Sequence, residues 1–533
     1  MELDKWFLDA FERGNAATEL DRRRGLAWST GNNVRPLIHG ATYFAALRDC
    51  AAELGTGDVL YFTDWRGDPD EKIDDHSGLT VSSVLCHAAK RGATVNGLIW
   101  RSHWDRLAFS AQQNRRLGAD IEAAGGCCLL DMRVRILGSH HQKFVIIRHA
   151  TTPTSDVAFV GGIDLCHSRR DDATHAGDPQ RQMMAAVYGD RPPWHDAQVA
   201  IRGPAVGDVE YVFRERWTDP HSLSRAPWRR VADRLHGERV KPRPLPPQPP
   251  DPAPAGTHAV QILRTYPKRW HGYSFAPQGE RSVARGYAKA LARSRSLIYL
   301  EDQYLWSAEV VEAFAVALRR EPQLRMIAVL PLHPDQDGRI SQPPNVVGRV
   351  ESVARLRAEG GDRVAIYGIE NRASVPIYVH AKICVLDDVW ASLGSDNVNR
   401  RSWTHDSELS CAVIDETLDD RAPLDPGGLG DGARRFARDL RLTLAREHLG
   451  RMDGGDDSDL IDPVSFFEAF ARSADALDAW HAGGNRGERP PGQLRRHTDI
   501  PISSRTLRWA QPLYHRVYDP DGRPRRLRRS HSF

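Results

Sequence analysis

Apolar and polar positions follow a helical period and then a strand-like run, and the same succession occurs twice in the chain. In the first half, an amphipathic pattern predicts a helix at Tyr43–Leu54 and an apolar run predicts a strand at Val59–Trp65. In the second half, GYAKALARSRS predicts a helix that precedes a strand at Leu297–Trp306. The segments TVNGLIW and LRMIAVLPL continue the alternation in the two halves. The pattern therefore predicts the α/β class, with two similar α/β sandwich domains in which helices flank a mixed sheet.

A proline-rich segment separates the two halves. Eight of the 13 residues in Pro242–Pro254 are proline, which disfavours helix and sheet and favours a stiff, extended spacer. Asp64 precedes His141 by 77 residues and Gln303 precedes His380 by 77 residues, which suggests an internal duplication. The predicted parts are an N-terminal extension (1–30), a first domain (31–240), a linker (241–256), a second domain (257–450) and a C-terminal extension (451–533).

Composition and charge exclude several classes of protein. With 41% hydrophobic and 27% charged residues, the 533-residue chain is not collagen-like, a coiled coil or wholly disordered. No apolar run approaches the roughly 18–20 residues that span a bilayer, and the N-terminus lacks the apolar core of a signal peptide. The seven Cys have no zinc-like or disulfide-like spacing. We therefore expect a cytoplasmic protein with reduced thiols and no transmembrane segment.

The C-terminal extension differs from the rest in charge. Residues 491–533 contain 10 basic and 3 acidic residues, although the whole chain carries only +3. One amphipathic helix is predicted within Pro463–Ala482, whereas the last eleven residues, RPRRLRRSHSF, are expected to lack a fold of their own. This basic tail could attract an anionic membrane surface.

Two His-x-Lys segments carry the candidate chemistry. They are HHQKFVII, with His141 and Lys143, and HAKICVLD, with His380 and Lys382. Because side chains alternate along a strand, each His and Lys would project from one face. With 22 His and only 8 Lys in the chain, chance placement gives about 0.3 such triplets. Two occurrences, one in each half, therefore point to a paired site rather than to two unrelated ion pairs.

Further polar and glycine residues follow each His-x-Lys segment. FVGGIDLC contains Gly161, Gly162 and Asp164, and LGSDNVNRRSW contains Gly394, Ser395 and Asn397. Glycines of this kind permit close approach of the backbone to a ligand. Later carboxylates, Asp196 in PPWHDAQ and Glu408 in RRSWTHDSEL, are candidates to orient an imidazole by a hydrogen bond to one ring nitrogen.

These phrases resemble the phospholipase D superfamily, whose signature is a duplicated His-x-Lys-x4-Asp followed by Gly-Ser-x-Asn. The resemblance spans roughly residues 35–450 and is strongest to the eukaryotic-type phospholipases D, through HHQKFVII, FVGGIDLC, LEDQYLW, VHAKICVLDD and the run that begins PPWHDAQVAIRGP. It implies two catalytic domains related by pseudo-twofold symmetry, with both His-Lys pairs in one cleft. It implies a glycerophospholipid substrate at a membrane surface, reached by peripheral contact at the inner face. It also implies that a monomer suffices, since both motifs lie in one chain.

The resemblance assigns roles that the spacing alone does not order. It makes His141 the nucleophile, which forms a phosphohistidine, and His380 the general acid and base. Lys143, Lys382 and Asn397 would neutralise the phosphate, so that no metal or cofactor is expected. The remaining catalytic candidates are Asp196 and Glu408, and the substrate-binding candidates are Gly161, Gly162, Asp164, Gly394, Ser395 and Gln303.

Arg148 and Asp164 are among the positions at which the chain departs from the family pattern. Arg148 occupies the place of the first motif Asp, which Asp387 fills in the second motif. On a strand both residues face away from the His and Lys, so we expect Arg148 to affect packing more than catalysis. Asp164 stands where Asn397 stands in the other half, so the two half-sites are not interchangeable.

Three other functions compete with phospholipid hydrolysis. A phosphatidyltransferase of the cardiolipin synthase type would pass the same intermediate to a lipid alcohol, but such enzymes usually carry membrane segments and a serine in both glycine strands. A nucleic-acid phosphodiesterase would need a basic body, whereas the first 450 residues carry about +1. A non-catalytic membrane scaffold is disfavoured because both His-Lys pairs are intact.

Overall fold

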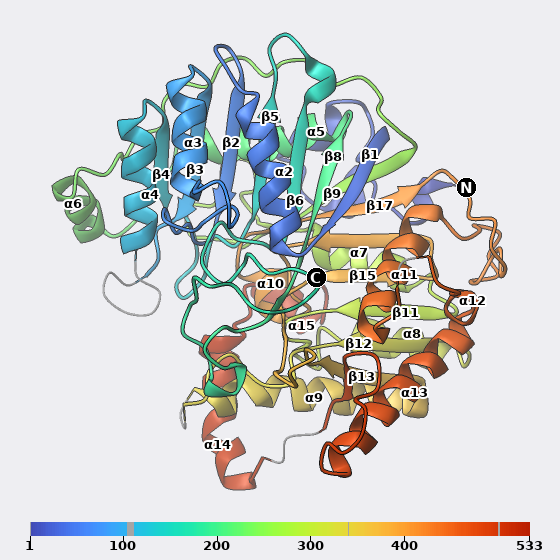
Figure 1. Ribbon diagram of the computed structural model, residues 1–533. Helices are drawn as coiled ribbons and strands as arrows, with labels where there is room; N and C mark the ends of the chain where they lie inside the picture. The colour runs from blue at the N-terminus through green and yellow to red at the C-terminus, as the bar shows by residue number, and fades with distance from the viewer. Residues whose placement is uncertain (1, 104–110, 339–340, 453, 499–501) are drawn as a thin grey trace.

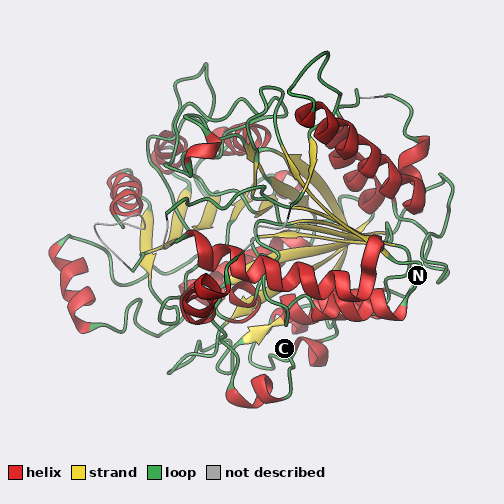
Figure 2. Ribbon diagram, turned by 90° about the horizontal axis from the view of Figure 1, so that it is seen from below, coloured by secondary structure: helices red, strands yellow, loops and turns green. Residues whose placement is uncertain are grey.

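One mixed β-sheet runs through the whole protein, and helices pack on both of its sides (Figures 1 and 2). The computed structural model describes residues 2–103, 111–338, 341–452, 454–498 and 502–533. Within this described part, the sheet contains 16 strands, and none of the helices combines the length and hydropathy of a membrane span.

The two halves of the chain have the same strand order. The first half provides β1 (Ser29–Ile38), β2 (Val59–Asp64), β3 (Thr94–Trp100), β4 (Cys127–Asp131), β5 (Phe144–Arg148), β6 (Val157–Gly161) and β8 (Ala197–Arg202). The second provides β9 (His258–Tyr266), β11 (Leu297–Glu301), β12 (Arg325–Val329), β13 (Val364–Ile369), β15 (Ile383–Leu386), β16 (Trp390–Gly394) and β17 (Glu408–Asp415). The spatial orders are β1-β8-β6-β5-β2-β3-β4 and β9-β17-β16-β15-β11-β12-β13. In both repeats the last two pairings are parallel and the others antiparallel.

The sheet confirms the predicted duplication but not the residue pair that suggested it. Thr63 lies opposite the first residue of β5 and Glu301 lies opposite the first residue of β15. The counterpart of Asp64 is therefore Asp302 rather than Gln303. In addition, β1 pairs with β9, so the two predicted sandwiches share one continuous sheet.

The helices bury the sheet on both sides. α2, α3 and α4 pack on the first repeat, α7, α8 and α9 pack on the second, and α5, α11 and α13 share one core with strands of both repeats. In β4, Cys127 and Leu129 enter one core while Cys128 and Leu130 enter another, as the strand period requires. The helices that cover the sheet are α2 (Gly40–Ala52), α3 (Val81–Lys90), α4 (Gln112–Ala123), α5 (Ala205–Trp217), α7 (Ser282–Leu291), α8 (Glu312–Arg320), α9 (Gln342–Gly360), α11 (Arg435–Leu449) and α13 (Pro463–Ala482).

Short elements complete the fold. They are α1 (Ala10–Arg13), α6 (Pro227–Leu235), α10 (Arg400–Thr404), α12 (Ser458–Ile461), α14 (Ser504–Leu513), α15 (Arg525–Arg529), β7 (Trp194–His195), β10 (Glu280–Arg281), β14 (Tyr378–Val379) and β18 (Leu494–Arg496). The basic tail was expected to lack a fold of its own, but this expectation was wrong. The tail forms α15, and the ring of Phe533 lies 5.5 Å from that of Trp403.

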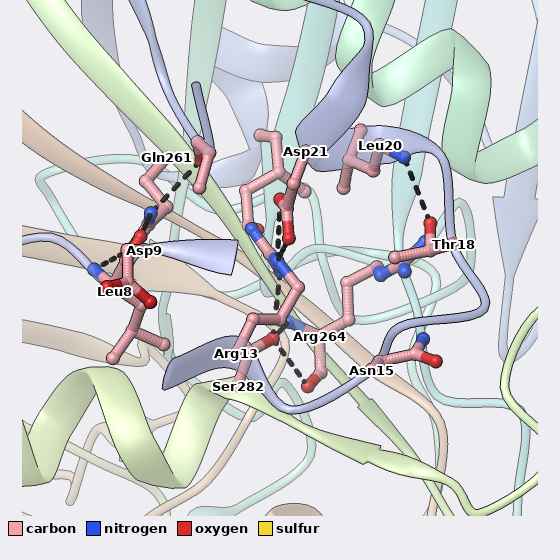
Figure 3. A network of polar contacts seen from close by, with 12 residues as sticks. Leu8, Asp9, Arg13, Asn15, Thr18, Leu20, Asp21, Gln261, Arg264 and Ser282 are labelled. Atoms are coloured by element: carbon pink, nitrogen blue, oxygen red, sulfur yellow. Dashed lines mark hydrogen bonds and ion pairs between the residues drawn. The ribbon is translucent and has the colours of Figure 1, made fainter. Parts of the chain in front are cut away.

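The N-terminal extension is anchored to the second repeat. Trp6, Phe7 and Leu8 belong to the same buried core as α7 and α8. Figure 3 shows Arg13 at the centre of a polar network, where its guanidinium donates to Asp21 at 2.8 Å and to Glu280 at 3.0 Å. The extension therefore packs against the second repeat beside β9, in the middle of the sheet.

Arg148 lies away from the candidate site, as the strand pattern predicted. Its guanidinium donates to Asp156 at 2.7 Å and to Glu210 at 2.6 Å. Its counterpart Asp387 instead accepts backbone N–H groups at the start of β11, including that of Leu297 at 2.8 Å. The two repeats therefore stabilise the same strand end by different ion and hydrogen-bond partners.

Candidate active site

Both His-x-Lys pairs lie immediately before a strand rather than on it. β5 and β15 each begin one residue after the lysine, which corrects the prediction that the motifs open the strands. Each lysine still contacts the histidine of its own motif. Lys143 Nζ donates to the carbonyl of His141 at 3.0 Å, and Lys382 Nζ lies 3.0 Å from His380 Nδ1. Each pair therefore presents an imidazole beside an ammonium.

Each imidazole is held by a carboxylate of the other repeat. His141 Nδ1 lies 2.9 Å from Glu408 Oε2, and this carboxylate also accepts from the Ser395 hydroxyl at 2.6 Å. His380 Nδ1 lies 2.6 Å from Asp196 Oδ2. A carboxylate at Nδ1 fixes the tautomer and leaves Nε2 of each ring for the reacting groups. The site is therefore incomplete in either repeat alone.

Two parallel backbone contacts produce this exchange of carboxylates. β7 and β14 pair in parallel with His195 opposite Val379, so the next residues, Asp196 and His380, are brought together. A parallel bridge between His140 and Ser407 does the same for His141 and Glu408. The two contacts are equivalent under the internal repeat.

The charges of both repeats act on His380. Burial lowers the pKa of His380 well below its ordinary value, and the charge of Lys382 lowers it further. Arg169, Lys143 and His141 act in the same direction. Burial also raises the pKa of Asp196 to about 6. His380 is therefore neutral at pH 7 in the free protein, and both His-Lys pairs share one electrostatic environment.

Gln303 and Asn397 lie next to the second pair. Lys382 Nζ donates to Gln303 Oε1 at 3.4 Å, and burial lowers the pKa of Lys382 to about 8. β16 ends at Gly394, so Ser395 and Asn397 lie in the following loop rather than on a strand. Among the described residues, the buried Oδ1 atom of Asn397 has no hydrogen-bond partner.

The first half-site contains a pair of carboxylates. Asp164 Oδ1 lies 3.6 Å from Lys143 Nζ. Burial and the neighbouring charge of Asp164 raise the pKa of Asp64 well above its ordinary value. Burial opposes ionisation of Asp164 as well, but Lys143 lowers its pKa to about 2. Asp64 is therefore the carboxyl of this pair that takes up a proton more readily, and Asp164 is the one that keeps its negative charge beside Lys143.

Comparisons with known proteins place this geometry in a family. Residues 72–311 match the family model described as phospholipase D, and residues 287–422 match the model described as the PLD-like domain of cardiolipin synthase. The chain belongs to the phospholipase D superfamily. This confirms the resemblance predicted from the motifs.

Similar proteins include eukaryotic phospholipases D. Phospholipase D A of Dictyostelium discoideum is 26% identical over 483 residues, which cover 78% of this chain and 36% of that protein. Phospholipase D alpha 2 of Oryza sativa subsp. japonica is 26% identical over 506 residues, which cover 70% of this chain and 58% of that protein. The chain thus spans 36% and 58% of these two relatives. Phosphatidylserine synthase of Haemophilus influenzae Rd KW20 matches 72% of this chain and 82% of its own, at 12% identity and a TM-score of 0.48.

The glycines of the phospholipase D motifs make room for protein side chains. A Cβ atom on Gly162 would lie 2.3 Å from Asp196 Oδ1, and one on Gly161 would lie 2.3 Å from Gln198 Oε1. A Cβ atom on Gly394 would lie 2.1 Å from the hydroxyl oxygen of Ser410. The glycine at 162 therefore lets the carboxylate that orients His380 approach the strand end, which differs from the predicted contact with a ligand.

Sequence reasoning missed two residues beside His380. The ring of Trp194 lies 5.0 Å from that of His380, and the guanidinium of Arg169 lies 3.9 Å from the centre of the Trp194 ring. Trp194 could have been identified from its place two residues before the candidate Asp196. Arg169 lies in an irregular loop, where no hydrophobic periodicity distinguishes it from other arginines.

A buried network of imidazoles and carboxylates adjoins the second motif. Glu447 lies 2.9 Å from His39 Nε2 and 3.0 Å from His175 Nε2. His195 joins this group to a second one, because its Nδ1 lies 3.4 Å from Glu447 and its Nε2 lies 2.6 Å from Glu301. The network therefore links the residue before α2 with β7, β11 and α11.

This network is also the part of the described chain with the composition of a metal site. His39, His175, His195 and Glu447 offer ligand atoms within 4.8 Å of one another, as do His195, Glu301 and His448. Such ligands suit a transition metal. However, the imidazole N–H groups that donate to the carboxylates already account for the arrangement. Sequence analysis missed the network because its histidines come from separate segments.

Proposed function

We propose that this chain is a phospholipase D that cleaves the distal phosphodiester bond of glycerophospholipids such as phosphatidylcholine, which gives phosphatidate and the free head group. The observation that carries the proposal is the pair of imidazoles, each bound at Nδ1 by a carboxylate of the other repeat and each beside a lysine. A single chain supplies both halves of this site, so a monomer suffices. The substrate lies in a membrane surface, which the protein reaches by peripheral contact.

The proposed reaction has two displacements at phosphorus. Nε2 of His141 attacks phosphorus, the bond to the head-group oxygen breaks, and His380 gives its proton to that oxygen. His380 then takes a proton from water or an alcohol, which attacks the phosphohistidine and releases phosphatidate or a phosphatidyl alcohol. Lys143 and Lys382 stabilise the non-bridging oxygens. The lysines keep His380 neutral in the free protein. The negative charge of the bound substrate raises the pKa of His380 and so favours its protonated form.

The products of vesicle hydrolysis test the proposal. Purified protein is incubated with phosphatidylcholine vesicles in the presence of ethanol and, separately, with single-stranded DNA. We expect phosphatidate and phosphatidylethanol, because a covalent intermediate partitions between the two acceptors. Cleavage of DNA with no lipid product would contradict the proposal and favour a nucleic-acid phosphodiesterase.

Transfer to a lipid alcohol is the second candidate. The match of residues 287–422 to the cardiolipin synthase model supports it. The same assay with added phosphatidylglycerol distinguishes the two: cardiolipin formed faster than phosphatidate identifies a phosphatidyltransferase. Gly162, which stands where the other half has Ser395, disfavours this candidate, because enzymes of this type usually carry a serine in both glycine strands.

The alkaline limit of activity should follow Lys382. Its pKa of about 8 means that the ammonium is present below pH 8 and is lost as the pH rises through that value. In the free protein His380 already loses its proton at lower pH, so kcat/KM for phosphatidylcholine declines with rising pH throughout, and above pH 8 we expect it to fall by about a further tenfold per pH unit. Lys382→Arg should be slower but should keep its charge, so the additional break near pH 8 should be absent from a profile measured between pH 6 and 10. A break near pH 8 that persists in Lys382→Arg contradicts the assignment.

A further inference from the structure

Helix α6 presents its apolar side chains to solvent. Trp228, Val231 and Leu235 are 73%, 54% and 82% exposed. At 100° per residue these three positions fall on one narrow face of the helix. A surface helix normally turns such a face toward the core. Exposed apolar clusters of this kind mark interaction sites.

The polar face of α6 is the one that contacts the protein. Asp233 is buried and accepts from Arg101 Nε at 2.8 Å, and Arg115 Nη2 lies 3.5 Å from the same carboxylate. These ion pairs fix the rotation of the helix about its axis. The apolar face therefore cannot turn inward without breaking a buried ion pair. Figure 1 shows α6 at the edge of the molecule, beyond α4.

A short series of contacts leads from α6 to the candidate nucleophile. Arg229 of α6 donates to the carbonyl of His103 at 3.3 Å. The ring of His103 lies 5.7 Å from that of Trp100, which stacks on Trp65 at 5.6 Å. The ring of Trp65 in turn lies 6.3 Å from that of His141. A surface that binds α6 would therefore lie near the substrate-binding side of the first half-site.

The loop before His141 adds a further exposed apolar residue to the same region. Ile136 is 88% exposed, and the carbonyl of Gly138, two residues later, lies 2.7 Å from His103 Nε2. α6 and this loop thus both contact His103. Arg230 and Arg234 of α6 are exposed, and neither forms an ion pair with another described residue. Apolar side chains flanked by free cations match a negatively charged lipid surface.

We infer that α6 and the loop at Ile136 form a docking face for an anionic phospholipid bilayer. Trp228, Val231 and Leu235 enter the boundary between head groups and acyl chains, and Arg230 and Arg234 bind lipid phosphates. The inference rests on the proposed function, since it names the surface by which the enzyme reaches its substrate. A second copy of the chain is the alternative occupant.

Vesicle binding tests the docking face without any turnover. Binding to vesicles of phosphatidylcholine and phosphatidylglycerol in a 7:3 ratio is measured by co-sedimentation. Trp228→Ala/Leu235→Ala should bind at least about tenfold more weakly than the unaltered protein. Arg230→Glu/Arg234→Glu should weaken binding to the mixed vesicles, more at low salt than at high salt, with little effect on pure phosphatidylcholine. Phe11→Ala/Leu418→Ala, which removes side chains that are 92% and 56% exposed elsewhere, should bind as the unaltered protein does.

Each outcome decides a separate question. Unchanged vesicle binding in both α6 variants overturns the docking face, whatever the activity. Weakened binding without any lipid cleavage by the unaltered protein supports docking and contradicts the proposed function. If light scattering shows that the α6 variants lose a dimer while their vesicle binding is unchanged, the face belongs to a second copy and the inference is overturned. The Arg variants change only exposed side chains, so they remain informative if Trp228→Ala/Leu235→Ala fails to fold.

Discussion

His141→Ala and His380→Ala should each lower kcat/KM for phosphatidylcholine by about 10⁴-fold or more, because one removes the nucleophile and the other the acid and base. Each substitution removes one imidazole–carboxylate hydrogen bond and leaves that of the other half-site intact. The fold should therefore be retained. His76→Ala, at an exposed position, serves as the control and should be fully active. Activity is measured as phosphatidate release, and thermal unfolding confirms the fold. Full activity in either variant contradicts the two-histidine mechanism.

The two variants should also differ in a way that orders their roles. A phosphodiester with a nitrophenolate leaving group needs no proton as its ester bond breaks. We therefore expect His380→Ala to release nitrophenol in a burst, with a phosphorylated protein accumulating, whereas His141→Ala should show neither. A burst in His141→Ala alone would reverse the assignment of nucleophile and acid.

Individual helices and strands could be predicted from the local pattern of apolar residues, whereas the pairing of distant strands could not. α2, β2, α7 and α13 were each predicted from apolar periodicity, and β11 ends earlier than predicted, at Glu301. The pairing of β1 with β9 could not be predicted, because the nearly continuous burial of β9 and the alternating burial of β1 do not indicate which strand lies beside each. The offset between Asp64 and Gln303 has the same origin, since register is set by pairing partners rather than by spacing.

The site could be predicted where a residue type was rare and repeated. The two His-x-Lys pairs stood out because Lys is scarce, and Asp196 and Glu408 followed as later carboxylates. Their exchange between repeats was missed, because it depends on a backbone bridge between His140 and Ser407 and on the pairing of β7 with β14. No single-sequence pattern encodes such contacts.

Asp196→Asn and Glu408→Gln should each lower kcat/KM for phosphatidylcholine by about 10²–10⁴-fold, because an amide no longer fixes the imidazole tautomer or stabilises the imidazolium. Both substitutions keep the volume of the side chain, so the fold should change little. Thermal unfolding and the pH profile separate a loss of orientation from a loss of structure.

The exchange of carboxylates predicts which variant the activated substrate rescues. Asp196 lies against His380, the proposed acid, so Asp196→Asn should recover most of its burst with the nitrophenyl ester. Glu408 lies against His141, the proposed nucleophile, so Glu408→Gln should recover little. If each carboxylate served the histidine of its own repeat, the rescue would be reversed. The comparison therefore tests whether each repeat completes the catalytic histidine of the other, separately from the order of the two histidines, which the alanine variants establish.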